Sequence, residues 1–153
     1  MSVPHLLDSC TLSQYLAPGA AKKMPGLVHR VDEVIAADGA RVSIVTVYEI
    51  DRGLKKLALR GEGQTKRRLF KMFLSTTTIY GLDAHSGSAW DIAADLHARA
   101  AVRSPTITFE EADLLIFSTA LANQMRLLTS DQRLVARLTE LGLGEHVEGL
   151  LVS

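Results

Sequence analysis

Short apolar stretches of strand length alternate with longer amphipathic stretches along this chain, and the alternation limits the folds available to it. The apolar stretches at 3–7, 41–47, 76–82 and 125–130 predict four strands, and 146–152 predicts a last strand at an edge of the sheet. Residues at helical spacing predict helices over 12–16, 27–38, 47–60, 65–74, 83–103, 109–124 and 132–141. This pattern is typical of a three-layer α/β/α sandwich with a central, mainly parallel sheet.

One segment interrupts the alternation. Residues 17–26, APGAAKKMPG, contain two prolines and two glycines and predict a loop or a broken turn. The chain of 153 residues fits one domain spanning 1–153. Because 47% of the residues are hydrophobic and only 5% are aromatic, its core must be mostly aliphatic.

Charge and cysteine content narrow the functional classes. Basic and acidic residues number 17 each, which argues against nucleic-acid binding by bulk charge alone but leaves a local basic face possible. The single cysteine, Cys10, cannot form an internal disulfide, which fits a reducing compartment. The sequence shows neither a signal-peptide pattern nor an apolar run of membrane-spanning length, so we expect a cytoplasmic protein.

Acidic residues follow three of the predicted strands. Asp8 follows the first strand, Glu49 lies in the first turn after the second, and Asp131 follows the stretch 125–130. Asp113, early in the helix that leads into that last stretch, is expected at the same edge of the sheet. Four carboxylates in one cleft repel each other unless a hard cation such as Mg²⁺ compensates. The pattern therefore points to metal-dependent phosphodiester hydrolysis.

Each acid also has a simpler structural interpretation. Asp8 and Asp131 stand where a helix N-cap is expected, and an acid in a first helical turn, such as Glu49, favours the helix dipole. Asp113 is harder to explain in this way because it lies in an apolar stretch. Taken singly, each acid is more simply structural, and only their shared edge favours a catalytic role.

Three stretches of the sequence resemble the motifs of PIN domains, in order and in approximate spacing. LLDSCTLS at 6–13 resembles the opening L-L-D-T-N-x-L-S, and VTVYEIDRGL at 45–54 resembles the second acidic element. ADLLIFSTALANQMRLLTSD at 112–131 resembles the third and fourth, D-x-L-I-A-A-x-A followed by a strand and T-x-D. The similarity spans nearly the whole chain and is strongest to the VapC-like toxins of bacterial toxin–antitoxin pairs.

The resemblance implies a metal-dependent ribonuclease. It assigns the metal, Mg²⁺ or Mn²⁺, and the catalysis to Asp8, Glu49, Asp113 and Asp131. It also implies RNA as the substrate, a cognate antitoxin as a partner and a homodimer. For a homodimer or an antitoxin groove, the sequence offers the apolar residues Leu12, Tyr15 and Leu16, which lie outside the obvious core stripes.

Two positions depart from the family pattern beside the first acid. Ser9 replaces the usual Thr and keeps a hydroxyl, which gives it a substrate-positioning role. Cys10 replaces the usual Asn, whose amide orients carboxylates better than a thiol does. We expect Cys10 to serve as packing.

The segment 51–71 is strongly basic, with eight basic residues against two acidic ones. It is either a solvated helical hairpin or a track that guides an RNA backbone toward the acids. The basic residues are Arg52, Lys55, Lys56, Arg60, Lys66, Arg67, Arg68 and Lys71.

Two other functions are compatible with the pattern. A catalytically weak PIN domain that binds RNA or a protein is favoured by Cys10. A phosphatase or receiver-type domain also gathers acids at strand ends, but it needs a lysine beyond a later strand, and none follows 125–130.

Overall fold

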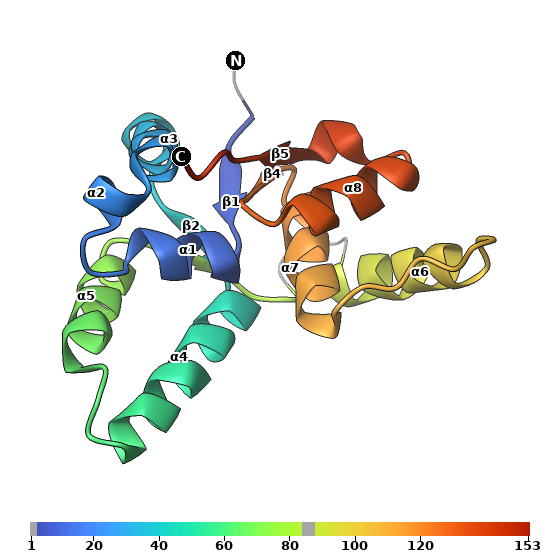
Figure 1. Cartoon of the computed structure of the whole chain (residues 1–153). Coiled ribbons are helices and arrows are strands. Elements are labelled where there is room, and N and C mark those ends of the chain that lie inside the picture. Colours follow the sequence, from blue (N-terminus) through green and yellow to red (C-terminus); the bar gives the residue numbers. More distant parts are fainter. Residues whose placement is uncertain (1–2, 84–87) are drawn as a thin grey trace.

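A five-stranded sheet lies at the centre of the protein, in a computed structural model that describes residues 3–83 and 88–153 (Figure 1). The strand order is β3-β2-β1-β4-β5, and every neighbouring pair is parallel. The strands are β1 (His5–Leu7), β2 (Arg41–Ser43), β3 (Thr78–Tyr80), β4 (Arg126–Thr129) and β5 (Val147–Gly149). The predicted central parallel sheet is confirmed.

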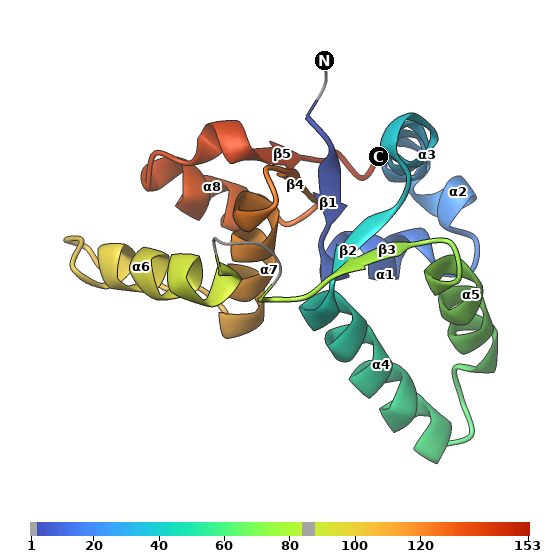
Figure 2. The same ribbon diagram turned by 180° about the vertical axis from the view of Figure 1, so that it is seen from behind.

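Helices cover both faces of the sheet (Figure 2). They are α1 (Ser9–Tyr15), α2 (Ala20–Lys23), α3 (Pro25–Asp38), α4 (Ile44–Leu59), α5 (Gln64–Leu74), α6 (Ala89–Ala101), α7 (Glu111–Ala122) and α8 (Gln132–Glu140). A short 3₁₀ turn, Gly144–His146, leads into β5. The three-layer α/β/α architecture predicted from the alternation is therefore confirmed.

The two largest hydrophobic clusters lie on opposite faces of the sheet. Leu6 and Leu7 point to opposite faces because successive strand residues alternate. Leu6 packs with Leu127 and with buried residues of α6, α7 and α8, among them Phe117. Leu7 packs with Leu128 and with α1, α3, α4 and α5. Apolar layers on both faces hold β1 in the middle of the sheet, and its carboxyl end delivers Asp8.

The second strand is shorter than predicted. β2 ends at Ser43, and the stretch expected to continue it to 47 is instead the first turn of α4. The Ser43 hydroxyl accepts a hydrogen bond from Val45 N at 3.2 Å and so caps the helix. The β-branched residues Ile44 and Val45 favour a strand locally, but this cap prevails. Glu49 therefore lies in the second turn of α4, not in the first turn after a strand.

The segment 17–26 is also more ordered than the predicted loop. It holds the short helix α2, and Pro25 is the first residue of α3. Proline fits a first helical position because its fixed φ is helical and its missing N–H would have no partner there. Of the predicted helix 83–103, residues Ala89–Ala101 form α6. Asp83 lies in a turn, and the expected interruption near Gly87 lies outside the described residues.

The apolar residues beside this segment are not a free surface. Leu12 is fully buried and Leu16 is 8% exposed, and both pack in the core with α3. The hydroxyl of Tyr15 donates to Asp32 at 2.5 Å. The expectation that these side chains mark a partner surface is therefore wrong for Leu12 and Leu16, whereas Tyr15 is partly buried against the same core.

Candidate active site at the carboxyl edge of the sheet

Asp8 is a buried carboxylate at the tip of the central strand. It is 3% exposed, and its Oδ1 accepts a hydrogen bond from Thr11 N at 2.9 Å, which caps α1. Its other oxygen accepts from the Thr129 hydroxyl. Burial raises the pKa of Asp8, hydrogen bonds from Thr11 and Thr129 oppose the rise, and the charge of Asp131 adds to it. The capping role predicted as an alternative is thus real, and it leaves the carboxylate inside the site.

Asp131 stands beyond the neighbouring strand, β4. Its Oδ1 accepts hydrogen bonds from Arg133 N at 3.0 Å and Leu134 N at 3.2 Å, so it caps α8. Its backbone N–H donates to Thr129 Oγ1 at 3.0 Å. One buried threonine hydroxyl therefore joins the first acid to the last across two adjacent strands.

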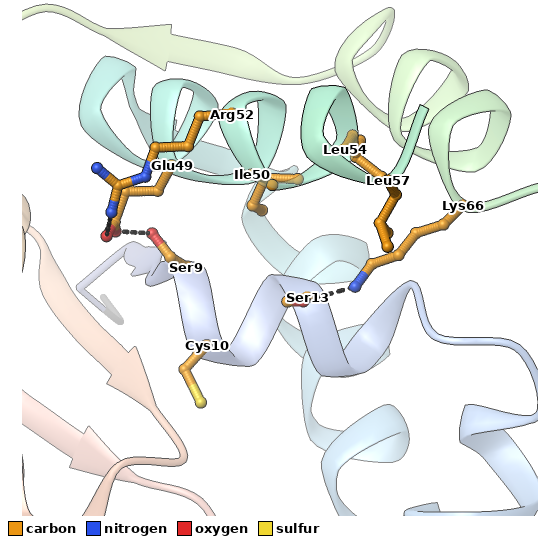
Figure 3. A pocket seen from close by; sticks show the side chains of 10 residues that line it. Ser9, Cys10, Ser13, Glu49, Ile50, Arg52, Leu54, Leu57 and Lys66 are labelled. Carbon is orange, nitrogen blue, oxygen red and sulfur yellow. Dashed lines mark hydrogen bonds and ion pairs between the residues drawn. The ribbon is translucent and has the colours of Figure 1, made fainter. Parts of the chain in front are cut away.

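Glu49 reaches the site from α4, where Ser9 holds it. The Ser9 hydroxyl donates to Glu49 Oε1 at 2.6 Å (Figure 3). It also lies 3.3 Å from Thr46 Oγ1. On its other oxygen, Glu49 lies 3.6 Å from Arg52 Nη2. Ser9 thus orients a carboxylate through its hydroxyl, and this contact ties the start of α1 to α4.

Asp113 is the residue on which the charges of the other acids act together. It lies in the first turn of α7 and is partly buried. The pKa of Asp113 is raised to about 6, and burial is the largest cause. Further contributions come from the negative charges of Asp8, Asp131, Glu49 and Glu110. Such accumulated repulsion is what a bound cation would relieve.

The donor set fits a hard divalent cation in its chemistry, since carboxylate oxygens are the ligands that Mg²⁺ prefers. The spacing of the side chains is less favourable. Across residues 3–83 and 88–153, no three His, Cys, Asp or Glu side chains are placed so that they could hold one metal ion. Metal binding would therefore require the carboxylates to move closer together than they are here.

Cys10 does not serve as packing, contrary to expectation. Its side chain is exposed, and Sγ lies 3.4 Å from Ser130 Oγ. Burial of part of the side chain raises the pKa of the thiol, and the charges of Asp8, Asp131 and Asp113 add to the rise. The position where the family has Asn therefore lies within the field of three acids.

Sequence reasoning missed the polar residues that connect these acids. Thr129 is fully buried between Asp8 and Asp131, and Thr46 lies beside Ser9. The only sequence signal for Thr129 was its place in the T-x-D pattern ahead of Asp131. A hydroxyl in that pattern supports two acids at once.

A cavity of about 320 Å³ adjoins the site between α1, α4 and α5 (Figure 3). Ser9, Glu49 and Arg52 line the end near the acids, and Lys66 reaches in from α5. The basic segment 51–71 therefore contributes two of its cations to the cavity wall.

Comparisons of the sequence and of the fold give different results. No protein-family model matches the chain, and no curated protein matches its sequence. Solved structures match closely in fold. VapBC2 from Rickettsia felis bound to a promoter DNA fragment has a TM-score of 0.68 at 15% identity, over 96% of this chain and 98% of that chain.

Two further structures extend the similarity. DNA-bound VapBC from Salmonella typhimurium has a TM-score of 0.66 at 16% identity, over 97% of this chain and 98% of that chain. FitAcB from Neisseria gonorrhoeae has a TM-score of 0.63 at 21% identity, over 88% of this chain and 93% of that chain. This chain therefore shares its fold, a PIN-like α/β/α sandwich, with these VapBC and FitAcB structures. No helix in the described part of the chain is long and apolar enough to cross a membrane.

Proposed function

We propose that this protein is a metal-dependent endoribonuclease and the toxin of a toxin–antitoxin pair. The observation that carries the proposal is the placement of Asp8 after β1, Asp131 after β4 and Asp113 at the start of α7, at the carboxyl edge of a parallel sheet. The negative charges of Asp8, Asp131 and Glu49 all raise the pKa of Asp113 there. This edge is where open α/β sheets bind their ligands. The toxin–antitoxin fold of the similar structures supports the biological role.

The chain's own residues supply the negative charge of the site, orient two of its carboxylates and contribute to placing the substrate. The four carboxylates hold negative charge that favours Mg²⁺ or Mn²⁺. Thr129 and Ser9 fix two of them, Asp8 and Glu49, in orientation. A bound metal would supply an activated water and stabilise charge on the phosphoryl oxygens. Ser9, at the junction of the acids and the cavity, contributes to substrate positioning through Glu49.

We further propose a cognate antitoxin and a second copy of the chain as partners, with the protein acting on RNA in the cytoplasm. The support for a second copy is an apolar groove between α4, α6 and α7, lined by Ile44, Tyr48 and Trp90 among others. Those three side chains are 43%, 62% and 51% exposed. Large apolar side chains that gather on one face are typical of a protein–protein interface.

The test of the nuclease is a cleavage assay on single-stranded RNA with Mg²⁺, with Mn²⁺ and with a chelator. Asp8→Asn keeps a capping side chain for α1 but removes the charge, so cleavage should fall by at least about 100-fold. Asp91→Asn, which changes an exposed acid on α6, is the matched control and should cut normally. Cleavage that persists in the chelator, or in Asp8→Asn, would exclude the proposed mechanism.

A second candidate is a catalytically weak domain of this fold that binds RNA or a protein. Two observations favour it: the acids are not arranged around a single point, and Cys10 stands where the family has an amide. The same assay separates the two candidates. Tight RNA binding without cleavage in either metal would select the binding module.

A further inference from the structure

Lys66 is held inside the cavity between α1, α4 and α5. Its Nζ donates to the Ser13 hydroxyl at 2.7 Å, so the side chain crosses from α5 to α1 (Figure 3). Gly63 makes this approach possible, because it has a φ of +78° and a Cβ there would meet Leu57 Cβ at 3.0 Å. The start of α5 therefore lies close against α4, which points Lys66 into the cavity.

The charge of Lys66 is not neutralised by the residues around it. In the described part of the chain, no carboxylate lies within 4.0 Å of its Nζ, and the hydroxyl of Ser13 to which it donates is neutral. Two other cations of the segment 51–71 do face a carboxylate. Lys55 pairs with Asp51 at 2.9 Å, and Arg52 lies 3.6 Å from Glu49. An ammonium group has three donors, so Lys66 keeps capacity for an anion.

The rest of the cavity is apolar on one side and leads to the acids. Ile50, Leu54 and Leu57 form the wall along α4, between Lys66 at one end and the Ser9–Glu49 pair at the other (Figure 3). Along the cavity, a cation is followed by an apolar wall and then by the acids. This order matches one nucleotide of an RNA strand: the cation suits a phosphate, the wall suits a flat base, and the acids suit the next phosphodiester.

We propose that this cavity is a subsite for one nucleotide of the RNA beside the cleaved phosphodiester. Lys66 binds the phosphate, Ser13 positions Lys66, and the apolar wall contacts the base. The inference rests on the proposed function and identifies how that site holds its substrate. The segment 51–71 around the cavity is strongly basic. Its positive charge favours an anionic polymer such as RNA over a protein segment that carries few acidic residues.

The first experiment is lysine footprinting of the unmodified protein. Lysines are acetylated with an activated ester, with and without a single-stranded RNA of about 20 nucleotides, in a chelator so that the RNA stays intact. Mass spectrometry gives the rate at each lysine. RNA should slow acetylation of Lys66 at least about fivefold and leave Lys71, an exposed lysine of α5 outside the cavity, within about twofold.

A matched pair of variants then measures the contribution to binding. Lys66→Gln should weaken RNA binding about tenfold and lower its dependence on salt, whereas Lys71→Gln, with the same loss of charge, should change it less than about threefold. Lys66→Arg keeps the charge and should restore much of the affinity. Unchanged thermal midpoints show that the variants are folded, and the footprint needs no variant.

The outcomes separate this inference from the nuclease itself. RNA that binds without protecting Lys66, or equal losses in Lys66→Gln and Lys71→Gln, would overturn the subsite even if the protein cleaves RNA. If RNA protects Lys66 in the footprint but the assay with Mg²⁺ or Mn²⁺ shows no cleavage, the RNA-binding subsite is supported and the nuclease activity is excluded. Protection by an acidic, leucine-containing peptide but not by RNA would make the cavity a protein-docking site and overturn the proposal.

Discussion

The Thr129 hydroxyl donates a hydrogen bond to the carboxylate of Asp8, and both side chains are buried at the centre of the sheet. The same oxygen accepts the backbone N–H of Asp131 at 3.0 Å. The contact crosses from β4 to β1, which pair in register at Leu7 and Leu128. The pairing of the two central strands therefore determines how the first acid is oriented.

We expect Thr129→Val to destabilise the protein by about 1–3 kcal/mol, because a buried carboxylate oxygen loses its donor while the side-chain volume stays similar. Thr129→Ser keeps the hydroxyl and should cost clearly less. Urea unfolding of both variants measures the difference. Equal losses would show that the threonine acts through packing of its methyl group and not through its hydrogen bond to Asp8.

Asp113 predicts a pH dependence of stability. Its pKa is about 6 in the folded protein, against a usual value of 3.8, so the folded state binds more protons between these values. The contribution of Asp113 to stability therefore falls as pH rises through this window and stays low above it. In metal-free protein at pH 7, Asp113→Asn should raise stability by about 1–2 kcal/mol, or about 3–6 °C in Tm.

The gain in Asp113→Asn should disappear below about pH 4, where the wild-type carboxyl is protonated as well. Glu111→Gln, in the same first turn of α7 but exposed, is the matched control and should show no such gain. A thermal melt series across pH measures both variants. A gain that is the same at pH 4 and pH 7 would contradict an origin in carboxylate repulsion.

The sequence was sufficient to predict the strand–helix alternation and the positions of Asp8 and Asp131 just after strands, because both depend on local patterns. It was not sufficient for the end of β2, where β-branched Ile44 and Val45 favoured a strand that the Ser43 cap terminates. The roles of Thr129 and Lys66 depend on which strands and helices become neighbours. No spacing within one stretch of sequence contains that information.

The apolar groove of α4, α6 and α7 leads to a prediction about assembly. If a second copy covers Trp90, which is 51% exposed, Trp90→Glu should shift the protein from dimer to monomer, because a charge would then be buried at the interface. Val102→Glu alters an exposed apolar residue that does not line the groove and should leave the mass unchanged. Light scattering over micromolar concentrations measures both. A wild-type protein that stays monomeric would contradict the homodimer.

Cys10 gives the last prediction, which concerns activity. The side chain lies in the field of Asp8, Asp113 and Asp131, and its thiol lies 3.4 Å from the neutral hydroxyl of Ser130. An Asn amide there would place stronger donors among the carboxylates, and Mg²⁺ has little affinity for sulfur. Cys10→Asn should therefore preserve or raise metal-dependent RNA cleavage.

The expected gain in Cys10→Asn is up to about tenfold, which corresponds to a change of about 1.4 kcal/mol in the barrier. Cys10→Ser, which lacks the amide, is the control and should resemble the wild type. Because Mn²⁺ tolerates softer ligands, the ratio of activity with Mn²⁺ to activity with Mg²⁺ should be higher in the wild type than in Cys10→Asn. If Cys10→Asn is inactive while Asp8→Asn still cuts, the roles assigned to these two residues are reversed.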